Sequence, residues 1–313
     1  MRIRQTGKIA EDFYVVGNPI MPVYLLDGDV PVMFDAGLRA LAPLYEADIK
    51  RILGGRSPQV LFLTHSHFDH IGAAGYFKKT WPDLKIAGSE KVQDILKRPR
   101  AVKTIRSLNR EAGRQIRSLR VASIDEAPFE AFELDLMLDP GQTFPLGQDM
   151  KVVCISSPGH TWDFMSYWIP ERCILVASEA VGCDDGTGYI YTEFLVDYDT
   201  YLKSLTDLST LNVRILCPGH GVVMTGSDAT GHMARAVDQA DAYVSMVQGF
   251  LRAEGGDIER TVMRVKEKEW DPKPWPKQIE SAYHLNTHAR VRCLHERMEG
   301  RSASSENAAD NGA

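Results

Sequence analysis

The sequence has 313 residues, of which 44% are apolar and 25% are charged, and its formal net charge is −6. These values are ordinary for a globular protein with one large domain or a core domain plus an appendage. The negative charge argues against a general nucleic-acid-binding protein. Since no apolar run approaches 18 residues and none follows the N-terminus, we expect neither a membrane span nor a signal peptide.

Three short runs rich in strand-forming residues open the chain, at 13–16, 23–26 and 32–34. Turn residues separate them, so the pattern predicts neighbouring strands of an antiparallel sheet. A helix is expected over 38–53, before Gly54-Gly55, and a buried strand over 60–63.

The stretch Thr64-His65-Ser66-His67-Phe68-Asp69-His70 follows that strand. Four potential metal ligands within six residues are too dense for a packing role, because imidazole and carboxylate groups are costly to bury without partners. They leave one loop in different directions and cannot all reach one ion, whereas two adjacent ions would use them all. Imidazole and carboxylate suit zinc, iron or manganese, so we expect two divalent metal ions.

A basic segment follows at about 97–120, with nine lysines and arginines against Glu111 alone. Its apolar residues recur at helical spacing, which predicts an amphipathic helix with a cationic face. That face is either simply solvated or a rim that attracts an anionic substrate or an acidic partner.

The second half repeats the strand-then-helix pattern. Strands are expected at 134–138, 151–155, 164–169, 173–177 and 213–216, with a helix at 198–211. Polar residues just past these strands are candidates for further metal ligands: His160, Glu179 and His220. The pattern favours an α+β fold in which two sheets pack face to face with helices outside.

Beyond residue 227 the sequence is helical. The periodic segments are 229–253, 258–268 and 278–298. We therefore expect a core domain over 1–227 with the basic helix inserted, a helical appendage over 228–299, and a disordered tail over 300–313. The five cysteines are widely spaced without a C-x-x-C pair, which indicates a reducing compartment and a cytoplasmic location.

Four motifs together resemble the metallo-β-lactamase-fold hydrolases over about residues 10–225. They are F-D-A-G at 34–37, T-H-S-H-F-D-H at 64–70, S-P-G-H-T at 157–161 and P-G-H-G at 218–221. The resemblance implies an αββα sandwich with a C-terminal helical extension and a dinuclear metal site at one edge.

Carried over by position, the resemblance assigns the first metal to His65, His67 and His160 and the second to Asp69, His70 and His220. Glu179 falls where the family has a bridging aspartate in a G-D pair, and here the pair is Ser178-Glu179. Glu179 alternatively contacts another ligand or faces solvent. Asp35 either accepts a hydrogen bond from a ligating histidine or caps the following helix.

The resemblance also implies a reaction in which a hydroxide bridging two metal ions attacks a carbonyl, with Asp69 as the catalytic residue that orients it. Leu108-Asn109-Arg110 and His284-Leu285 resemble segments of glyoxalase II-like and quinolone-signal thioesterase-type members. That likeness implies that the last helix covers the site, with His284 or Thr287 facing the substrate. Ordinary helix packing is the alternative role for both.

The leading hypothesis is therefore a thioesterase for a small anionic substrate such as an acyl-coenzyme A or glutathione thioester. Arg106 and Arg110 would then engage its negative groups. One alternative is a lactone or ester hydrolase on the same site. Another is a signalling or partner-binding protein with weak residual hydrolase activity, because Glu179 replaces the usual aspartate. We expect no nucleic-acid or membrane partner, and a homodimer is left open.

Overall fold

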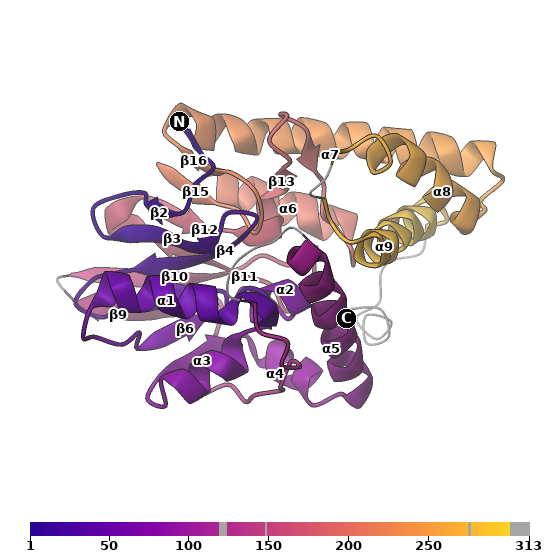
Figure 1. The fold of residues 1–313 in the computed structure, drawn as a ribbon. Coiled ribbons are helices and arrows are strands. Elements are labelled where there is room, and N and C mark those ends of the chain that lie inside the picture. Colours follow the sequence, from indigo (N-terminus) through magenta and orange to yellow (C-terminus); the bar gives the residue numbers. More distant parts are fainter. Residues whose placement is uncertain (119–123, 148, 275–276, 301–313) are drawn as a thin grey trace.

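The computed structural model describes residues 1–118, 124–147, 149–274 and 277–300. Two seven-stranded sheets pack face to face, and helices cover the outer side of each (Figure 1). The predicted αββα sandwich with C-terminal helices is confirmed. The expected disordered tail, apart from Gly300, lies outside the described residues.

The first sheet is built from the N-terminal half and has the strand order β2-β3-β4-β5-β6-β7-β8. Its strands are β2 (Gly7–Lys8), β3 (Phe13–Asn18), β4 (Met21–Leu26), β5 (Val32–Phe34), β6 (Val60–Phe62), β7 (Lys85–Gly88) and β8 (Leu136–Met137). The three strands from β3 to β5 pair antiparallel, as predicted, and those from β5 to β8 pair parallel. Parallel neighbours end at the same edge, so the loops after β5 and β6 meet there.

The second sheet has the order β1-β16-β15-β12-β11-β10-β9. Its strands are β1 (Arg2–Ile3), β9 (Thr143–Gly147), β10 (Met150–Ser156), β11 (Met165–Ile169), β12 (Ile174–Val176), β15 (Ile215–Cys217) and β16 (Val223–Thr225). The strands β12 and β15 are parallel. A small antiparallel pair, β13 (Cys183–Asp184) and β14 (Ile190–Tyr191), lies between β12 and α6 in the chain. Sequence patterns missed β1, β2, β9, β13, β14 and β16.

Three apolar layers hold the sandwich together. Aromatic rings dominate the layer between the sheets, where Phe62 lies 5.5 Å from Phe34 and 5.1 Å from Tyr167 between ring centroids. On the first sheet lie α1 (Ala42–Leu53), α3 (Ala74–Thr80), α4 (Glu90–Leu96) and α5 (Pro99–Ser118). On the second lie α6 (Tyr198–Ser209) and α7 (Ser227–Ala253).

The basic segment forms α5, as its periodicity predicted. Its buried face consists of Ala101, Ile105, Asn109, Ala112 and Ile116, and its arginines point outward. Asn109 ties the helix to the core, because its amide donates to the Phe68 carbonyl at 2.8 Å and accepts from the Arg39 backbone N–H at 3.0 Å. The helix is thereby fixed beside the histidine-rich loop.

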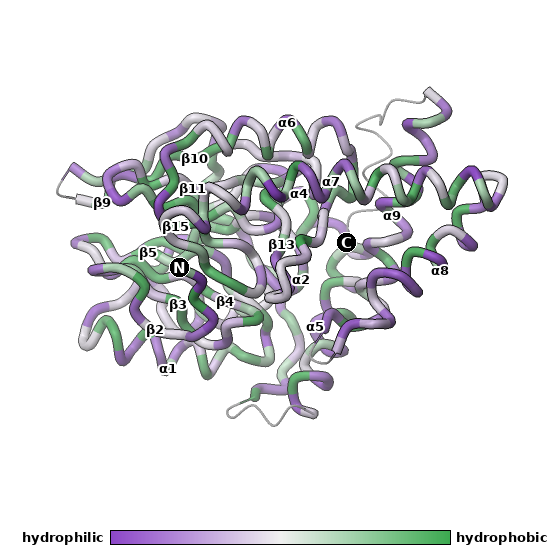
Figure 2. Tube along the Cα trace, turned by 90° about the horizontal axis from the view of Figure 1, so that it is seen from above, coloured by the Kyte–Doolittle hydropathy of each residue, from purple (hydrophilic) through white to green (hydrophobic). Residues whose placement is uncertain are grey.

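The last part of the chain is helical: α7, α8 (Ile258–Glu269) and α9 (Glu280–Met298). Figure 1 shows α8 and α9 beside one end of the sandwich, and Figure 2 shows hydrophobic and hydrophilic residues interspersed along these helices. No helix among the described residues is both long and apolar enough to cross a bilayer.

A buried ion pair anchors α9. The Arg290 guanidinium, 1% exposed, donates to Glu269 Oε2 of α8 at 2.8 Å and to the Thr192 carbonyl at 3.1 Å. The hydroxyls of Tyr189 and Tyr283 donate to the Glu269 carboxylate at 2.8 and 2.7 Å. Since Tyr189 and Thr192 flank β14, the network joins the appendage to the loop beside the sandwich edge.

Candidate metal site

The histidine-rich stretch occupies the loop after β6 and the first turn beyond it. His65 and His67 lie in the loop, while Asp69 and His70 belong to the short helix α2 (Phe68–Ile71). The Ile71 backbone N–H donates to the His67 carbonyl at 3.1 Å, which forms a helical turn and places Asp69 and His70 on adjacent sides of it. One sharp turn thus directs four polar side chains toward the sheet edge.

The second sheet supplies three more side chains at the same edge. His160 lies in the turn between β10 and β11, and His220 lies in the loop after β15. Glu179 lies in the 3₁₀ turn Ser178–Val181, which follows β12. Because β12 and β15 run parallel, Glu179 and His220 leave the sheet on the same side. The structure brings all seven proposed ligands together.

The ligand atoms form three overlapping groups, and the atoms of each group lie within 4.8 Å of one another. The groups are His65, His67 and His160; His65, His70 and Glu179; and Asp69, His70 and His220. The first and third groups are the two ligand sets proposed from sequence. The second group contains Glu179 together with His65 of the first set and His70 of the third. Glu179 therefore lies where it can span both positions.

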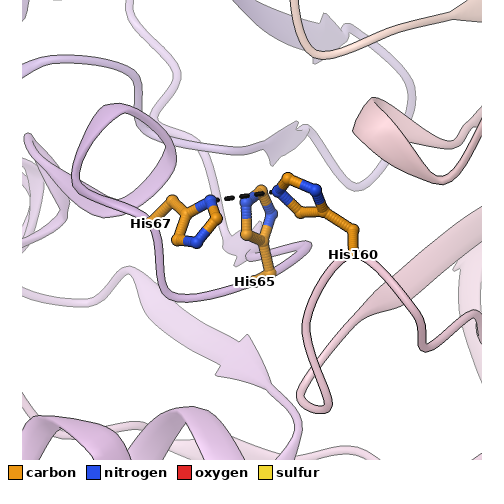
Figure 3. Close-up of side chains that lie close together, drawn as sticks. All are labelled: His65, His67 and His160. Atoms are coloured by element: carbon orange, nitrogen blue, oxygen red, sulfur yellow. Dashed lines mark hydrogen bonds between the residues drawn. The ribbon is translucent and has the colours of Figure 1, made fainter. Parts of the chain in front are cut away.

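Distances within the cluster are short. His70 Nε2 and His220 Nε2 lie 2.9 and 3.1 Å from Glu179 Oε1, and His220 Nε2 lies 3.4 Å from Asp69 Oδ2. In Figure 3 the rings of His65, His67 and His160 converge, and a hydrogen bond of 3.0 Å joins His67 Nδ1 to His160 Nε2.

Four of the histidines are held by their outer ring nitrogen. The Nδ1 atoms of His160 and His220 donate to the carbonyls of Glu193 and Ile20. His70 Nδ1 lies 2.9 Å from Asp35, and His65 Nδ1 lies 3.0 Å from the Thr64 hydroxyl. A proton on Nδ1 leaves the Nε2 lone pair directed inward, which is the orientation that metal ligation requires.

Asp35 organises the loop around His70. Its carboxylate accepts from the Thr64 backbone N–H at 2.8 Å and from the Thr64 hydroxyl at 2.9 Å, in addition to its contact with His70. The following 3₁₀ turn starts after Leu38 and has no side-chain cap. Of the two roles considered for Asp35, the geometry matches hydrogen bonding to a ligating histidine.

The donor set fits divalent metal ions. His65 Nε2 is buried and makes no hydrogen bond to any described residue, a costly arrangement unless a cation binds there. Burial and the neighbouring His67 lower the pKa of His160 to about 3, and burial with His70 and His67 holds the pKa of His65 well below its usual range. Both imidazoles are therefore neutral, as ligation requires.

The Glu179 carboxylate in the cluster is ionised. Burial alone would raise the pKa of Glu179, yet His70 and His220 hold it well below its ordinary value. Burial would likewise lower the pKa of His70, but Glu179 and Asp35 raise it well above normal. In this cluster the negative charge of Glu179 lies beside the positive charge of protonated His70. A divalent cation can replace the protons that now supply this positive charge.

The neighbours of Glu179 accommodate its longer side chain. The Ser178 hydroxyl donates to Glu179 Oε2 at 2.6 Å, and Ser178 itself has φ 46°, a conformation that favours glycine. A Cβ added at Gly219 would lie 2.2 Å from Glu179 Oε1. The carboxylate of the longer Glu179 side chain thus occupies space left by a glycine in the loop that carries His220.

A pocket opens over the cluster between α5 and α9. Besides six of the seven candidate ligands, all but His65, it is lined by Phe68, Ile105, Leu108, Glu193, Gln278, Ala282, Leu285 and Asn286. Neither His284 nor Thr287 is among the described lining residues; Thr287 is fully buried and accepts a hydrogen bond from Arg290 at 3.0 Å. Their neighbours Leu285 and Asn286 face the pocket instead, since successive residues of a helix point in different directions.

The arginines expected near the substrate lie on the other side of α5. Arg106 donates to the Phe129 carbonyl at 3.1 Å. Arg110 lines a separate cavity of about 300 Å³ together with Arg39, Arg114 and Arg117. Sequence reasoning missed Glu193, Gln278 and Asn286 because none of them belongs to a recognisable motif.

Comparisons with known proteins agree with this geometry. A model of the metallo-beta-lactamase superfamily matches residues 21–220. A Dictyostelium discoideum protein named Glyoxylase B2 is 28% identical over 130 residues, 42% of this chain and 38% of that protein. A Caenorhabditis elegans Beta-lactamase-like protein 2 homolog is 33% identical over 90 residues, 29% of this chain and 25% of that protein. The matches thus span well under half of either relative.

Solved structures share the fold at low identity. A metallo-beta-lactamase family protein from Thermus thermophilus has a TM-score of 0.65 at 17% identity, covering 94% of this chain and 95% of its own. An archaeal superfamily protein from Sulfolobus tokodaii has a TM-score of 0.58 at 18% identity, covering 92% and 99%. Because the family model spans from β4 to the His220 loop and so includes every residue of the cluster, the chain belongs to the metallo-beta-lactamase superfamily.

Proposed function

We propose that the protein hydrolyses a thioester of a small anionic carrier, such as coenzyme A or glutathione, on a site that holds two divalent metal ions. The observation that carries the metal-dependent part is the convergence of seven ligand side chains from both sheets in three overlapping groups. The partial similarity to a protein named Glyoxylase B2 favours a thioester. Zinc and iron suit the nitrogen-rich donor set, and manganese is the third candidate.

Two bound divalent ions would acidify a water molecule and polarise the scissile carbonyl. His65, His67 and His160 would hold one ion, Asp69, His70 and His220 the other, and Glu179 would contact both. Asp69 is the proposed catalytic residue: its carboxylate is available to accept a hydrogen bond from the attacking water and so orient it. Asp35 would orient the His70 ring, and the Glu193 carbonyl would orient the His160 ring, so that both can bind metal.

The pocket walls match an acyl thioester. Ile105 and Leu108 of α5 face Ala282 and Leu285 of α9 and offer an apolar slot to the acyl group. The arginines of the separate cavity on the other side of α5, Arg110 and Arg114 among them, would attract a phosphate or carboxylate group of the thiol carrier that extends beyond the pocket. The proposed location is cytoplasmic, in keeping with five free cysteines.

A substrate screen on the metal-loaded protein tests this function. We expect acetyl- and butanoyl-coenzyme A or S-acylglutathione to be cleaved at least tenfold more efficiently than homoserine lactones or p-nitrophenyl esters. Preference for lactones would select the alternative hydrolase. Loss of bound metal in His67→Ala without loss of biological activity would instead favour the partner-binding role.

A further inference from the structure

Asp163 lies in the turn that carries His160 but belongs to none of the three ligand groups. The residue is 2% exposed, and its Oδ2 accepts a hydrogen bond from the Ser66 backbone N–H at 2.8 Å. Ser66 lies between His65 and His67 in the loop after β6. Asp163 thus directly links the two loops whose histidines form the first ligand group.

Neighbouring residues extend this link along both loops. The Phe164 ring stacks on the His65 imidazole, with 4.7 Å between centroids and 21° between planes. The Met165 backbone N–H donates to the Thr64 carbonyl at 2.8 Å. The two segments therefore run side by side in opposite directions. A backbone hydrogen bond holds one end of this short alignment, and the Asp163 side chain holds the other.

The backbone of the turn is anchored separately from the Asp163 side chain. The Ser89 hydroxyl donates to the Asp163 carbonyl at 2.7 Å, and the Lys91 ammonium donates to the Trp162 carbonyl at 3.1 Å. Both donors lie at the start of α4, on the first sheet. Replacing the Asp163 side chain should therefore leave the turn in place and release only the loop that contains Ser66.

The Asp163 side chain makes a single hydrogen bond to the described residues. Its other oxygen, Oδ1, is also buried and has no hydrogen-bond partner among them. Burying a carboxylate with one donor costs free energy, but Asp163 acts electrostatically on His67, and the divalent ion proposed to bind there would offset its negative charge. What this side chain contributes by contact is therefore the bond to Ser66.

We propose that Asp163 is a positioning residue for the first metal ion: by holding the Ser66 N–H, it keeps His65 and His67 directed toward His160 (Figure 3). The inference rests on the metal site of the proposed function. Without this bond the loop would adopt other orientations, and binding of the ion would have to restore the right one at a cost in affinity.

Asp163→Leu and Asp163→Asn separate the hydrogen bond from the volume of the side chain. Leucine has a similar shape but no acceptor, whereas asparagine keeps an oxygen for Ser66. In the chelator-treated protein, the Ser66 amide hydrogen should exchange at least about tenfold faster in Asp163→Leu than in the wild type, because losing a charged hydrogen bond eases local opening. Exchange in Asp163→Asn should stay close to the wild type. If the leucine variant does not fold, Asp163→Ala takes its place with the same expectations.

Zinc titrations followed by calorimetry measure the effect on the site. We expect Asp163→Leu to weaken binding of one ion by about tenfold to a hundredfold, the usual range for residues that orient a metal ligand. Asp163→Asn should stay within about fivefold of the wild type, because it keeps a neutral form of the bond. In a His160→Ala background, which lacks a ligand of the first ion, Asp163→Leu should no longer change zinc affinity.

Asp135→Leu is the matched control. The Asp135 carboxylate also accepts from a backbone N–H of the first sheet, that of Ile86 at 2.9 Å, but it lies outside the ligand groups and the pocket lining. This variant should be less stable in urea, while its zinc affinity and its Ser66 exchange rate stay at wild-type values.

Three results would overturn the inference. The first is equal Ser66 exchange in the wild type and Asp163→Leu. The second is an equal loss of zinc affinity in Asp163→Asn and Asp163→Leu, which would make charge and not the hydrogen bond the cause. The third is a similar loss in Asp135→Leu, which would indicate general destabilisation. If the wild type binds no zinc, the proposed function fails, and Ser66 exchange still decides whether Asp163 holds the loop.

Discussion

At the scale of single residues, the replacement of the usual aspartate by Glu179 is part of a local adaptation. The longer side chain extends toward Gly219, where any Cβ would come within 2.2 Å of its carboxylate, and the Ser178 hydroxyl holds the other oxygen. The glutamate, the serine and the glycine fit together as one unit. We therefore propose that Glu179 is a working bridging ligand.

Gly219→Ala should displace the Glu179 carboxylate, lower the bound metal from two equivalents toward one, and reduce kcat/KM at least tenfold. Metal analysis and steady-state kinetics measure both effects. Combining it with Glu179→Asp should restore metal binding in part, because the shorter acid clears the new methyl group. Gly249→Ala in α7, where nothing lies within 4 Å of the added Cβ, is the control. Full metal content in Gly219→Ala would refute this account.

The Glu193 carboxyl should make the free energy of unfolding depend on pH. Burial raises the pKa of its carboxyl to about 7 from 4.5, so between these values the folded protein holds a proton that the unfolded chain has released. This contribution to the free energy of unfolding therefore falls as pH rises from about 4.5 to about 7, by on the order of 1–3 kcal/mol.

Glu193→Gln should consequently stabilise the chelator-treated protein at pH 8, and the gain should shrink toward pH 5. Urea unfolding of both proteins at a series of pH values measures the difference. A constant difference across that range would show that the carboxyl has an ordinary pKa.

At the scale of elements, α5 carries Arg106, Arg110 and Arg114 at successive i,i+4 positions. Like charges at this spacing destabilise a helix by about 0.2–0.5 kcal/mol per pair, so the row is not there for helix stability. Beyond Arg117, the cationic residue Arg120 lies outside the described residues. We propose that the row attracts the anionic group of the thiol carrier.

Arg110→Glu should raise KM for acyl-coenzyme A about tenfold and leave KM for an uncharged thioester unchanged. The substitution creates two favourable i,i+4 pairs, so helix stability should rise slightly, and a KM effect cannot then be assigned to unfolding. Raising the salt concentration should weaken wild-type binding and leave the variant almost insensitive. Equal KM changes for charged and uncharged substrates would contradict a role in binding the carrier.

At the scale of the whole molecule, the Arg290–Glu269 ion pair holds α9 against α8, and Arg290 also bonds the Thr192 carbonyl outside the appendage. Arg290→Met should lower the free energy of unfolding by about 3–5 kcal/mol, because it leaves Glu269 buried without its partner. The double variant Arg290→Met, Glu269→Leu should recover most of that loss, as measured by urea unfolding. A double variant as unstable as the single one would show that the packing of the arginine stem, and not its charge, matters.

The sequence predicted the sandwich and all seven candidate ligands, because the histidine motifs and the strand ends are both local signals. Asn286 escaped notice because its position depends on how α9 docks, and Glu193 because the segment after β14 carries no recognisable motif. Thr287 was expected near the substrate, but its hydroxyl serves Arg290 instead. Short strands such as β13 and β14 lack enough residues for a periodic signal.

The anchoring of α9 has a consequence for how substrate reaches the metals. Swinging this helix outward would separate Arg290 from Glu269 in a dry interior, at a cost of several kcal/mol, and would pull on the Thr192–Glu193 segment that steadies His160. We therefore expect the helix to stay in place when substrate enters. If the pocket entrance opens, we expect the movement on the α5 side. Backbone amide hydrogens should then exchange faster along α5 than along α9.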